Sequence, residues 1–325
     1  MCMLMRFTLA LMVSTHGSGD PVSGGRFEWT KIQKKVTVLL PLPKNMFRLS
    51  CNGKILNLSV PAVMGILNIT PDSFFDGGQF LSIDEQLKQT GRMLDEGASI
   101  IDIGAVSTRP GAPEVCQTSE LERLLPSIKA IRSRFPEAIL SVDTYRPLIA
   151  RAAVEHGADM INDIYGGRYE ASMMSTVASL KVPYIIMHMK GQPPVMQNNP
   201  AYSDVVAEVT YFFEKQVAEA RSKGIRDIII DPGFGFGKTL EHNYRLLSGL
   251  EALHSIEAPV MVGISRKSMV YKALGSGPED ALTGTTVLNT LALVKGARIL
   301  RVHDVKEAVE VIRLIETMNT YSNEL

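Results

Sequence analysis

The chain has 325 residues, of which 45% are hydrophobic and 21% are charged, and its formal net charge is zero. This is the composition of an ordinary globular protein with ample chain for a large core. The balanced charge gives no basic field that would attract nucleic acid or a membrane surface, so we expect neither as a partner.

The first 45 residues differ from the rest of the chain, because Met1–Val13 is rich in Met and other apolar residues. We expect residues 1–45 to be an extension that is disordered or reflects a start codon assigned too early, with Met46 as an alternative start. A signal peptide is the other reading, since Arg6 precedes the apolar run Phe7–Val13.

Cysteine usage and hydropathy bear on the compartment. The three cysteines, Cys2, Cys51 and Cys116, are odd in number and widely spaced, so they predict neither a disulfide framework nor a zinc site. No run approaches the roughly 18 apolar residues that a membrane span requires. We therefore expect no membrane span and a reducing compartment, the cytoplasm.

Two elements open the patterned part of the chain. Phe47–Leu58 has short alternating runs around Asn52-Gly53, which predicts a β-hairpin with a two-residue turn. We expect this hairpin to plug the bottom of the fold that follows. Ala62–Leu67 is an apolar run that stops at Asn68, as a buried parallel strand does where its carboxyl end faces a ligand site.

A pattern then recurs, in which a helix ends at Gly and the next apolar strand ends at a polar residue. Glycine supplies the left-handed conformation that closes the helix. The four copies run over 97–102, 157–162, 224–231 and 296–301. Three further strands are predicted at Ile139–Val142, Val182–Met187 and Pro259–Gly263. With the opening strand this makes eight.

The segments between the strands carry helix signals. Three pairs have capping-box spacing, namely Ser82 with Glu85, Ser119 with Glu122, and Asp304 with Glu307. Eight strands that alternate with helices predict an α/β fold, a single (β/α)8 TIM barrel over residues 46–325 preceded by the hairpin. An open doubly wound sheet is the alternative.

In such a barrel, the carboxyl ends of the strands meet on one face. Seven polar residues would then ring one pocket: Asn68, Asp102, Asp143, Asn162, His188, Asp231 and Arg301. Carboxylates and amides suit hydrogen bonding to a flat heterocycle better than chelation of a transition metal. The alternative for each residue taken alone is a helix cap or a loop anchor.

The last strands add basic residues. Arg301 and His303 are two positions apart and so share a strand face, and the strand that ends at Asn68 is their neighbour once the barrel closes. The loops after strands seven and eight often bind phosphate, so we expect an anion site here that includes Gly263–Ser268. A salt bridge to a barrel carboxylate is the alternative for Arg301, and a position at a helix start is the alternative for His303.

The segment Asp231–Thr239 ends in Gly-Lys-Thr and so resembles a P-loop. Pro232 stands where a P-loop requires its first glycine, which argues against nucleotide binding. We expect instead a tight glycine loop that lays Phe234 or Phe236 against a ring.

Together these motifs resemble those of the dihydropteroate synthases of folate biosynthesis. The resemblance covers residues 46–325 and rests on Met64–Gly78, Ser107–Gly111, Ser141–Thr144, Asn162-Asp163, Met187–Met189, Asp231–Lys238, Ser265–Ser268 and Arg301–Asp304. It implies a transferase that joins 6-hydroxymethyl-7,8-dihydropterin pyrophosphate to p-aminobenzoate and releases pyrophosphate. It also implies Mg²⁺ as cofactor and a homodimer.

The resemblance implies a role for each matching residue. The pterin would be bound by Asp143, Asn162, Asp231 and Lys267, with Met187 and Phe236 packed on it. The pyrophosphate would be held by Asn68, Thr108, Arg301 and His303, with the metal near Asn68. The p-aminobenzoate site would be formed by Thr108, Arg109, Pro110 and Ser268. The implied catalytic set is Asn68, Asp143, Asp231, Lys267, Arg301 and His303.

The sequence departs from the family pattern at Ala105-Val106, where Gly-Glu is common, and at Phe75, where Ser is common. Both departures affect loop geometry and leave the assigned residues intact. Two rival functions are a corrinoid-linked pterin methyltransferase and a non-catalytic pterin-binding paralogue. The first has no need of the anion motifs, and the second would have lost Lys267, Arg301 or His303. For the apolar segment Val287–Val294 we expect a dimer interface, with core packing as the alternative.

Overall fold

The structure is a computed structural model that describes residues 47–70, 82–106, 115–191, 196 and 200–322. The predicted extension over residues 1–45 lies outside this part. The described chain begins with two antiparallel strands, β1 (Arg48–Cys51) and β2 (Lys54–Asn57). The turn between them is made by Asn52 (φ 48°) and Gly53 (φ 90°), so the predicted hairpin is confirmed.

Eight parallel strands follow the hairpin. They are β3 (Ala62–Asn68), β4 (Ile100–Gly104), β5 (Ile139–Asp143), β6 (Met160–Asp163), β7 (Tyr184–Met187), β8 (Ile228–Asp231), β9 (Met261–Val262) and β10 (Ile299–Val302). Their hydrogen-bonded order is β8-β7-β6-β5-β4-β3-β10-β9, and a bridge between Ile230 and Val260 joins the two ends of the series. The predicted (β/α)8 barrel is confirmed, and the open doubly wound alternative is wrong.

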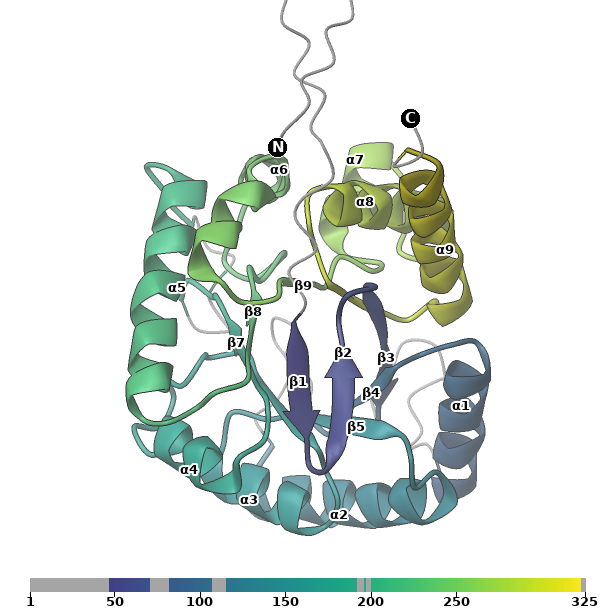
Figure 1. Cartoon of the computed structure of the whole chain (residues 1–325), viewed down its shortest axis with the longest axis vertical. Helices are drawn as coiled ribbons and strands as arrows, with labels where there is room; N and C mark the ends of the chain where they lie inside the picture. The colour runs from purple at the N-terminus through teal and green to yellow at the C-terminus, as the bar shows by residue number, and fades with distance from the viewer. Residues whose placement is uncertain (1–46, 71–81, 107–114, 192–195, 197–199, 323–325) are drawn as a thin grey trace, which may run out of the picture. The chain divides into compact units, whose positions relative to one another are not determined.

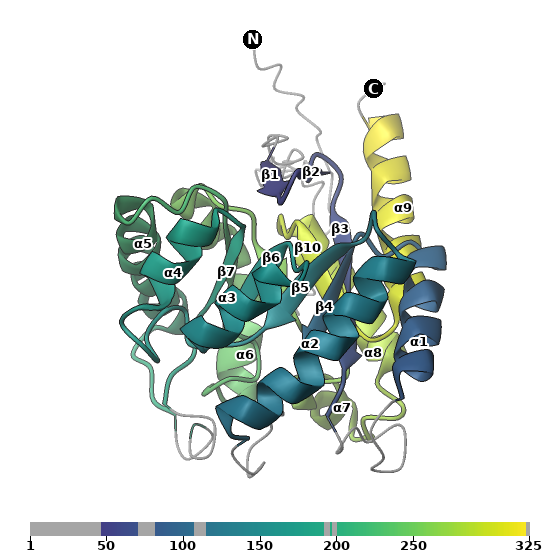
Figure 2. The same cartoon turned by 90° about the horizontal axis from the view of Figure 1, so that it is seen from below.

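Helices surround the strands (Figures 1 and 2). They are α1 (Ile83–Asp95), α2 (Gln117–Arg134), α3 (Pro147–Glu155), α4 (Met173–Leu180), α5 (Val205–Ser222), α6 (Leu240–Ser248), the 3-10 helix η1 (Leu250–Ile256), α7 (Ser268–Leu274), α8 (Leu282–Val294) and α9 (Val305–Ser322). Within the described ranges, no helix is both long and apolar enough to span a bilayer.

The local signals at the helix ends held at most positions. The Ser82–Glu85 capping box forms at the start of α1. The Ser119–Glu122 capping box was wrong, because α2 already begins at Gln117, and its N-cap Cys116 makes no side-chain cap. The four glycines predicted to close helices all have φ between 92° and 111°: Gly97, Gly157, Gly224 and Gly296.

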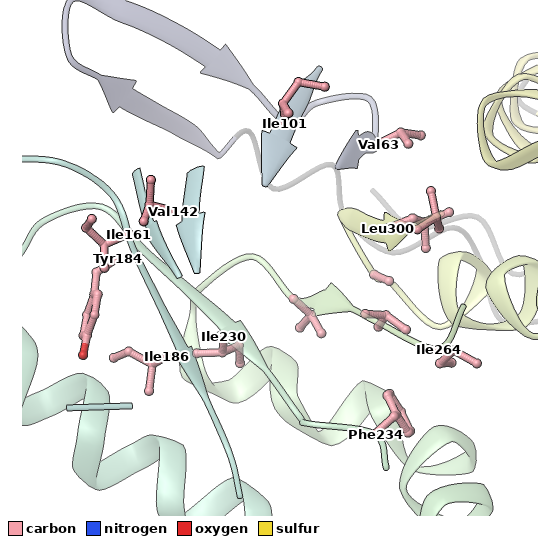
Figure 3. Close-up of a cluster of buried hydrophobic side chains, with 14 of the residues drawn as sticks. Val63, Ile101, Val142, Ile161, Tyr184, Ile186, Ile230, Phe234, Ile264 and Leu300 are labelled. Carbon is pink, nitrogen blue, oxygen red and sulfur yellow. The ribbon is translucent and has the colours of Figure 1, made fainter. Parts of the chain in front are cut away.

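Alternation along each strand divides the core into two parts. One set of side chains points outward to the helices and forms the larger cluster of buried apolar residues. Figure 3 shows members of this cluster, including Val63, Ile101, Val142, Ile161, Ile186, Ile230 and Leu300. This outer cluster attaches the helices to the barrel, because the apolar face of each helix packs against these strand side chains.

The other set points into the barrel near the starts of the strands. Its members are Met64, Ile100, Ile139, Met160, Ile185, Ile229, Met261 and Ile299, packed with Leu49, Cys51, Leu56 and Leu58 of the hairpin segment. We call this cluster the barrel floor. Lys54 of β2 also pairs with Asp159, with Nζ 3.1 Å from Oδ1. The hairpin therefore covers the end of the barrel at which the strands begin, as predicted.

Candidate active site

Polar side chains replace apolar ones in the barrel interior directly above the floor. On β8, Ile229 belongs to the floor, and Asp231 follows it on the same strand face. The same two-residue step leads from Ile100 to Asp102 on β4, and equivalent steps give Asn162 on β6 and Arg301 on β10. We call this polar layer, with Asn68, Asp143, Lys267 and His303, the barrel mouth.

Two glycines show how closely the side chains of the mouth approach one another. A Cβ atom built on Gly263 would lie 3.8 Å from Lys267 Nζ, 3.9 Å from Arg301 Cβ and 4.0 Å from Asp231 Oδ2. A Cβ on Gly104 would lie 3.6 Å from Asn68 Oδ1 and 4.0 Å from Asp143 Oδ2. The structure thus brings charged groups from β5, β8 and β10, together with Lys267 and the Asn68 amide, around two glycines that carry no side chain.

Arg301 is held by two carboxylates. Its Nε donates to Asp102 Oδ2 at 2.7 Å, and one terminal nitrogen donates to Asp143 Oδ2 at 3.2 Å. Burial would lower the pKa of Arg301, but these carboxylates outweigh burial and raise it. Its side chain remains 18% exposed, so it can still meet a ligand. The salt-bridge alternative for Arg301 is therefore confirmed.

Burial moves the pKa values of three further groups of the mouth, Asp143, Asp231 and Lys267, toward the neutral pH range. Desolvation raises the pKa of Asp143 to about 7, against the attraction of Arg301. Desolvation also raises the pKa of Asp231, and the charge of Lys267 opposes this shift. Desolvation lowers the pKa of Lys267 to about 8. Groups with pKa values displaced toward neutrality in a cleft are typical of functional sites.

An apolar wall adjoins these charges. Met187, which is 3% exposed, packs in a small cluster with Met189 and Met196, and Phe236 lies against this cluster. The Lys267 ammonium lies 4.7 Å from the centroid of the Phe236 ring and donates to the Phe234 carbonyl at 2.7 Å. A flat ring with polar edges can therefore meet both hydrogen-bonding groups and an apolar surface here.

Ser265 lies in the predicted anion-binding segment Gly263–Ser268, but the sequence alone gave it no individual role. Its hydroxyl oxygen accepts from the His303 backbone N–H at 3.2 Å and lies 3.1 Å from His303 Nδ1. Desolvation and the charge of Arg301 lower the pKa of His303, although the residue as a whole is exposed. A neutral imidazole with Nδ1 accepting from Ser265 presents Nε2 as a donor. The Ser-Arg-Lys-Ser motif was the sequence signal for Ser265.

The other residues of that motif have different surroundings. Arg266 has a positive φ of 54° and makes a double hydrogen bond to Asp304, at 2.9 and 2.6 Å. This pair ties the loop after β9 to the start of α9, so Arg266 has a structural partner. Ser268, predicted to bind p-aminobenzoate, is the half-buried first residue of α7.

The glycine loop after β8 has no P-loop geometry. Lys238 is 3% exposed and its Nζ donates to the Gly233 carbonyl at 2.9 Å and lies 3.0 Å from His188 Nδ1. A Cβ on Gly233 would collide with the His188 carbonyl oxygen, which explains the glycine there. His188 is therefore buried behind the loop, where desolvation lowers its pKa to about 2. Its predicted place in the ring was wrong.

Some predicted residues cannot be placed. Thr108, Arg109 and Pro110 lie outside the described residues, as does Phe75. In the part of the chain that the structure describes, no three His, Cys, Asp or Glu side chains come close enough together to hold a metal ion. Asn68, the predicted metal ligand, offers one carboxamide oxygen beside Asp143.

Comparison with known proteins identifies the family. Residues 64–303 match the family model described as "Pterin binding enzyme". The dihydropteroate synthase of Escherichia coli (strain K12) is 46% identical over 271 residues, which cover 83% of this chain and 95% of that protein.

Two solved structures are similar to this one. The Yersinia pestis dihydropteroate synthase in a sulfonamide drug complex has a TM-score of 0.81 and 43% identity, covering 84% of this chain and all of that one. The Xanthomonas albilineans enzyme in complex with 7,8-dihydropteroate has a TM-score of 0.75 and 39% identity, covering 83% and 98%. The chain therefore belongs to the pterin-binding enzymes, and among them to the dihydropteroate synthases.

Proposed function

We propose that the barrel mouth condenses 6-hydroxymethyl-7,8-dihydropterin pyrophosphate with p-aminobenzoate to give 7,8-dihydropteroate and pyrophosphate. The observation that carries this proposal is the meeting of Asp231, Lys267 and Arg301 around Gly263. Acceptors for a heterocycle thus lie next to donors for a phosphate group. The similar Xanthomonas albilineans enzyme was solved with 7,8-dihydropteroate, which joins both organic parts of the reaction.

The pterin is assigned to the deep side of the mouth. Asp143 and Asp231 are acceptors for the parallel N–H groups of an aminopyrimidine edge, and Asn162 adds an amide. Asp231 Oδ1 already accepts from the Gly233 N–H at 2.8 Å, which fixes the carboxylate and leaves Oδ2 beside Lys267. Such a site rejects rings that lack the matching donors, because its own buried groups would go unpaired.

The pyrophosphate is assigned to Arg301, His303 and Asn68, with Thr108 as a further ligand. We propose that the Asn68 oxygen would hold a Mg²⁺ ion bound to the pyrophosphate, since Mg²⁺ is commonly held by few protein oxygens together with substrate phosphates. A bound Mg²⁺ would help to neutralise the charge of the leaving group.

The reaction replaces one bond to the methylene carbon of the pterin. The arylamine nitrogen attacks this carbon, the bond to the pyrophosphate oxygen breaks, and the electron pair leaves with pyrophosphate. Arg301 and the neutral His303 stabilise the negative charge that develops on that oxygen. Asp231 stabilises positive charge that spreads into the ring. The nitrogen then loses one proton to water, and as a weak base it needs no strong general base beforehand.

The p-aminobenzoate is assigned to Ser268 together with Thr108, Arg109 and Pro110. Ser268 begins α7 directly after Lys267, so a ligand at Ser268 would lie next to the pterin pocket. Because the pyrophosphate ligands adjoin both pockets, we expect the pterin pyrophosphate to bind before the amine.

An assay of the purified protein tests this function. With the pterin pyrophosphate, p-aminobenzoate and Mg²⁺ it should form dihydropteroate and pyrophosphate in equal amounts. A non-catalytic paralogue would bind the pterin without turnover. A corrinoid-linked methyltransferase would form no dihydropteroate, and either result would overturn the proposal.

We also propose that the protein is a cytoplasmic homodimer that pairs through α8 and α9. On α8, Leu288 and Leu293 are buried, whereas Val287, Leu291 and Val294 are 53%, 45% and 57% exposed. Leu314 on the adjoining α9 is 71% exposed. The segment therefore serves core packing and also leaves an apolar face open.

Substitution on this face tests the dimer. Leu291→Glu would place a charge in the apolar contact, so we expect the variant to elute as a monomer in size-exclusion chromatography with light scattering, while the wild type elutes as a dimer. Tyr211→Glu on α5, where Tyr211 is 56% exposed, is the matched control and should remain dimeric. A monomeric wild type would contradict the proposal.

A further inference from the structure

Asp102 has no role in the proposed reaction so far, yet it lies at the centre of the mouth. It is the third residue of β4, above Ile100 of the floor, and it is completely buried. A carboxylate in such a place is costly to bury unless it is paired and hydrogen-bonded. Its contacts therefore indicate what keeps it there.

One oxygen of Asp102 joins the two halves of the proposed site. Oδ2 accepts from Arg301 Nε at 2.7 Å and from Asn162 Nδ2 at 3.0 Å. Arg301 belongs to the proposed anion site, and Asn162 belongs to the proposed pterin site. Asp143 also binds Arg301, but within the described part of the chain it makes no hydrogen bond to Asn162.

The other oxygen is unusual. Oδ1 of Asp102 is buried and has no hydrogen-bond partner among the described residues. Ser141, its register partner on β5, also has a buried hydroxyl without a partner there. A stability-optimised core would satisfy or remove such atoms, and half-satisfied polar groups in native proteins are concentrated at functional sites.

The contact with Asn162 fixes which way its amide points. An ionised carboxylate only accepts hydrogen bonds, so the amide must turn its NH₂ toward Asp102 and its carbonyl oxygen away. Asn162 is 3% exposed, and turning its amide over would place its carbonyl oxygen against the Asp102 carboxylate, two acceptors with no donor between them. The amide oxygen is thereby held as an acceptor for an N–H of the ring.

The contact with Arg301 fixes the guanidinium in the same way. Asp102 takes Nε and Asp143 takes one terminal nitrogen, so the plane of the guanidinium is set by two carboxylates. Within the described residues the second terminal nitrogen makes no hydrogen bond or ion pair. Fixed planar donors recognise phosphate oxygens better than mobile ones.

We propose that Asp102 is a positioning residue that orients Asn162 for the pterin and Arg301 for the pyrophosphate at the same time. It touches neither substrate. The inference rests on the proposed function and assigns a single buried carboxylate to both halves of the site. Loss of its charge should therefore weaken the binding of two chemically different ligands together.

The test compares Asp102→Asn with the wild type by calorimetry, using 6-hydroxymethyl-7,8-dihydropterin and inorganic pyrophosphate as separate probes. The new amide can keep its carbonyl oxygen in the place of Oδ2, but it removes the negative charge that strengthens both hydrogen bonds. We expect the affinity for each probe to fall at least about tenfold, since the hydrogen bond on each side loses its charge assistance. Ser141→Ala, at the paired position on β5, is the matched control and should bind both probes as the wild type does.

Two further variants guard the result. Asp102→Glu keeps the charge that offsets Arg301, so the variant should fold. Its longer side chain cannot hold one oxygen at the point where Asp102 Oδ2 meets both partners. It should therefore also lose affinity for both probes. In the double variant Asp102→Asn/Asn162→Ala, pterin affinity should be no lower than in Asn162→Ala alone, because Asp102 acts through Asn162.

Two outcomes would overturn the inference. In one, Asp102→Asn melts at a lower temperature but binds both probes with wild-type affinity, which would make Asp102 only a counter-ion. In the other, the two Asp102 and Asn162 effects on pterin affinity are additive. Wild-type turnover is measured separately, so that failure of the proposed function is recognised by the absence of dihydropteroate and not by these affinities.

Discussion

The floor and the mouth occupy neighbouring positions on the same strands and have opposite chemistry. Ile229 and Asp231 lie on one face of β8, and both are buried, at 0% and 5% exposure. The floor contains apolar side chains sealed by the hairpin. The mouth contains charges, shifted pKa values and unpartnered oxygens. Apolar burial in the floor thus stabilises the folded barrel, whereas the mouth holds polar and charged groups whose burial opposes folding.

The magnitudes support this division. Burial of one aliphatic side chain in the floor contributes about 1.5–3 kcal/mol. In the mouth, raising the pKa of Asp143 from 3.8 to about 7 disfavours its charged form by an amount on the order of 4 kcal/mol. Ionised Asp143 therefore lowers the free energy of unfolding, and a ligand that donates an N–H group to it recovers part of that loss.

The largest effect is expected in the mouth. Asp231→Asn removes the acceptor for the pterin and the partner of Lys267, so kcat/KM and pterin affinity should fall by about 10²–10³-fold. The free energy of unfolding should stay the same or rise, because a buried carboxylate is removed. Calorimetry with 6-hydroxymethyl-7,8-dihydropterin and chemical denaturation measure the two effects. Undiminished pterin affinity would remove Asp231 from the role.

The same strand supplies the counterpart in the floor. Ile229→Ala leaves a cavity beneath Asp231 and should lower the free energy of unfolding by about 2–5 kcal/mol. Assayed well below its melting temperature, it should keep kcat/KM within a few-fold of the wild type. A loss of activity as large as that of Asp231→Asn would show that the floor and the mouth do not work separately.

The pH dependence should report the mouth alone. Ionised Asp143 and protonated Lys267 are needed to bind the pterin, so kcat/KM should be bell-shaped, with limbs near the pKa values of about 7 and about 8. Asp143→Asn should abolish the acid limb, and Ile229→Ala should leave both limbs in place. An unchanged acid limb in Asp143→Asn would assign it to another group.

The contribution of Asp143 to stability should depend on pH in the opposite sense from that of a carboxylate whose pKa is lowered by folding. The folded pKa of Asp143 lies above its unfolded value, so the folded state binds the extra proton between about pH 4 and pH 7. The contribution of Asp143 therefore favours folding at low pH and is lost as pH rises through 7. Denaturation curves of the wild type and Asp143→Asn should converge at low pH.

The smallest effect is expected at the link between hairpin and barrel. Lys54→Met breaks the pair with Asp159 but leaves Arg132 and the Leu140 N–H bound to that carboxylate. Because the Lys54 side chain is 23% exposed, we expect a loss of no more than about 1 kcal/mol. Asp159→Asn should cost more in the same denaturation experiment. Equal losses would contradict this ranking.

Much of the fold could be predicted because its signals are local. The alternation of apolar residues and the helix-closing glycines depend only on residues near in sequence, and together they gave the eight strands and the closed barrel. The polar residues that end β3, β5 and β8 could be found in the same way, since strand ends of a barrel share one face.

The rest depends on contacts between distant segments. His188 follows Met187 directly, so the two point to opposite sides of the strand, and only one can face the interior. Arg266 and Lys267 lie in a loop that has no repeating pattern of side-chain directions. Only the position of Asp304 decides that Arg266, and not Lys267, turns away from the mouth. Asp102 contacts Asn162, which lies 60 positions further along the chain, and Arg301, which lies 199 positions further along. No local sequence pattern reveals these two contacts.

The hairpin across the floor has a consequence for molecular traffic. Because Leu49, Leu56 and their neighbours close one end of the barrel, we expect reactants and products to enter and leave through the other end, the mouth. The ligand that binds deepest must then enter first and leave last. Product release and substrate binding therefore use the same path, so a compound that resembles the product can block both the entrance and the deep pocket.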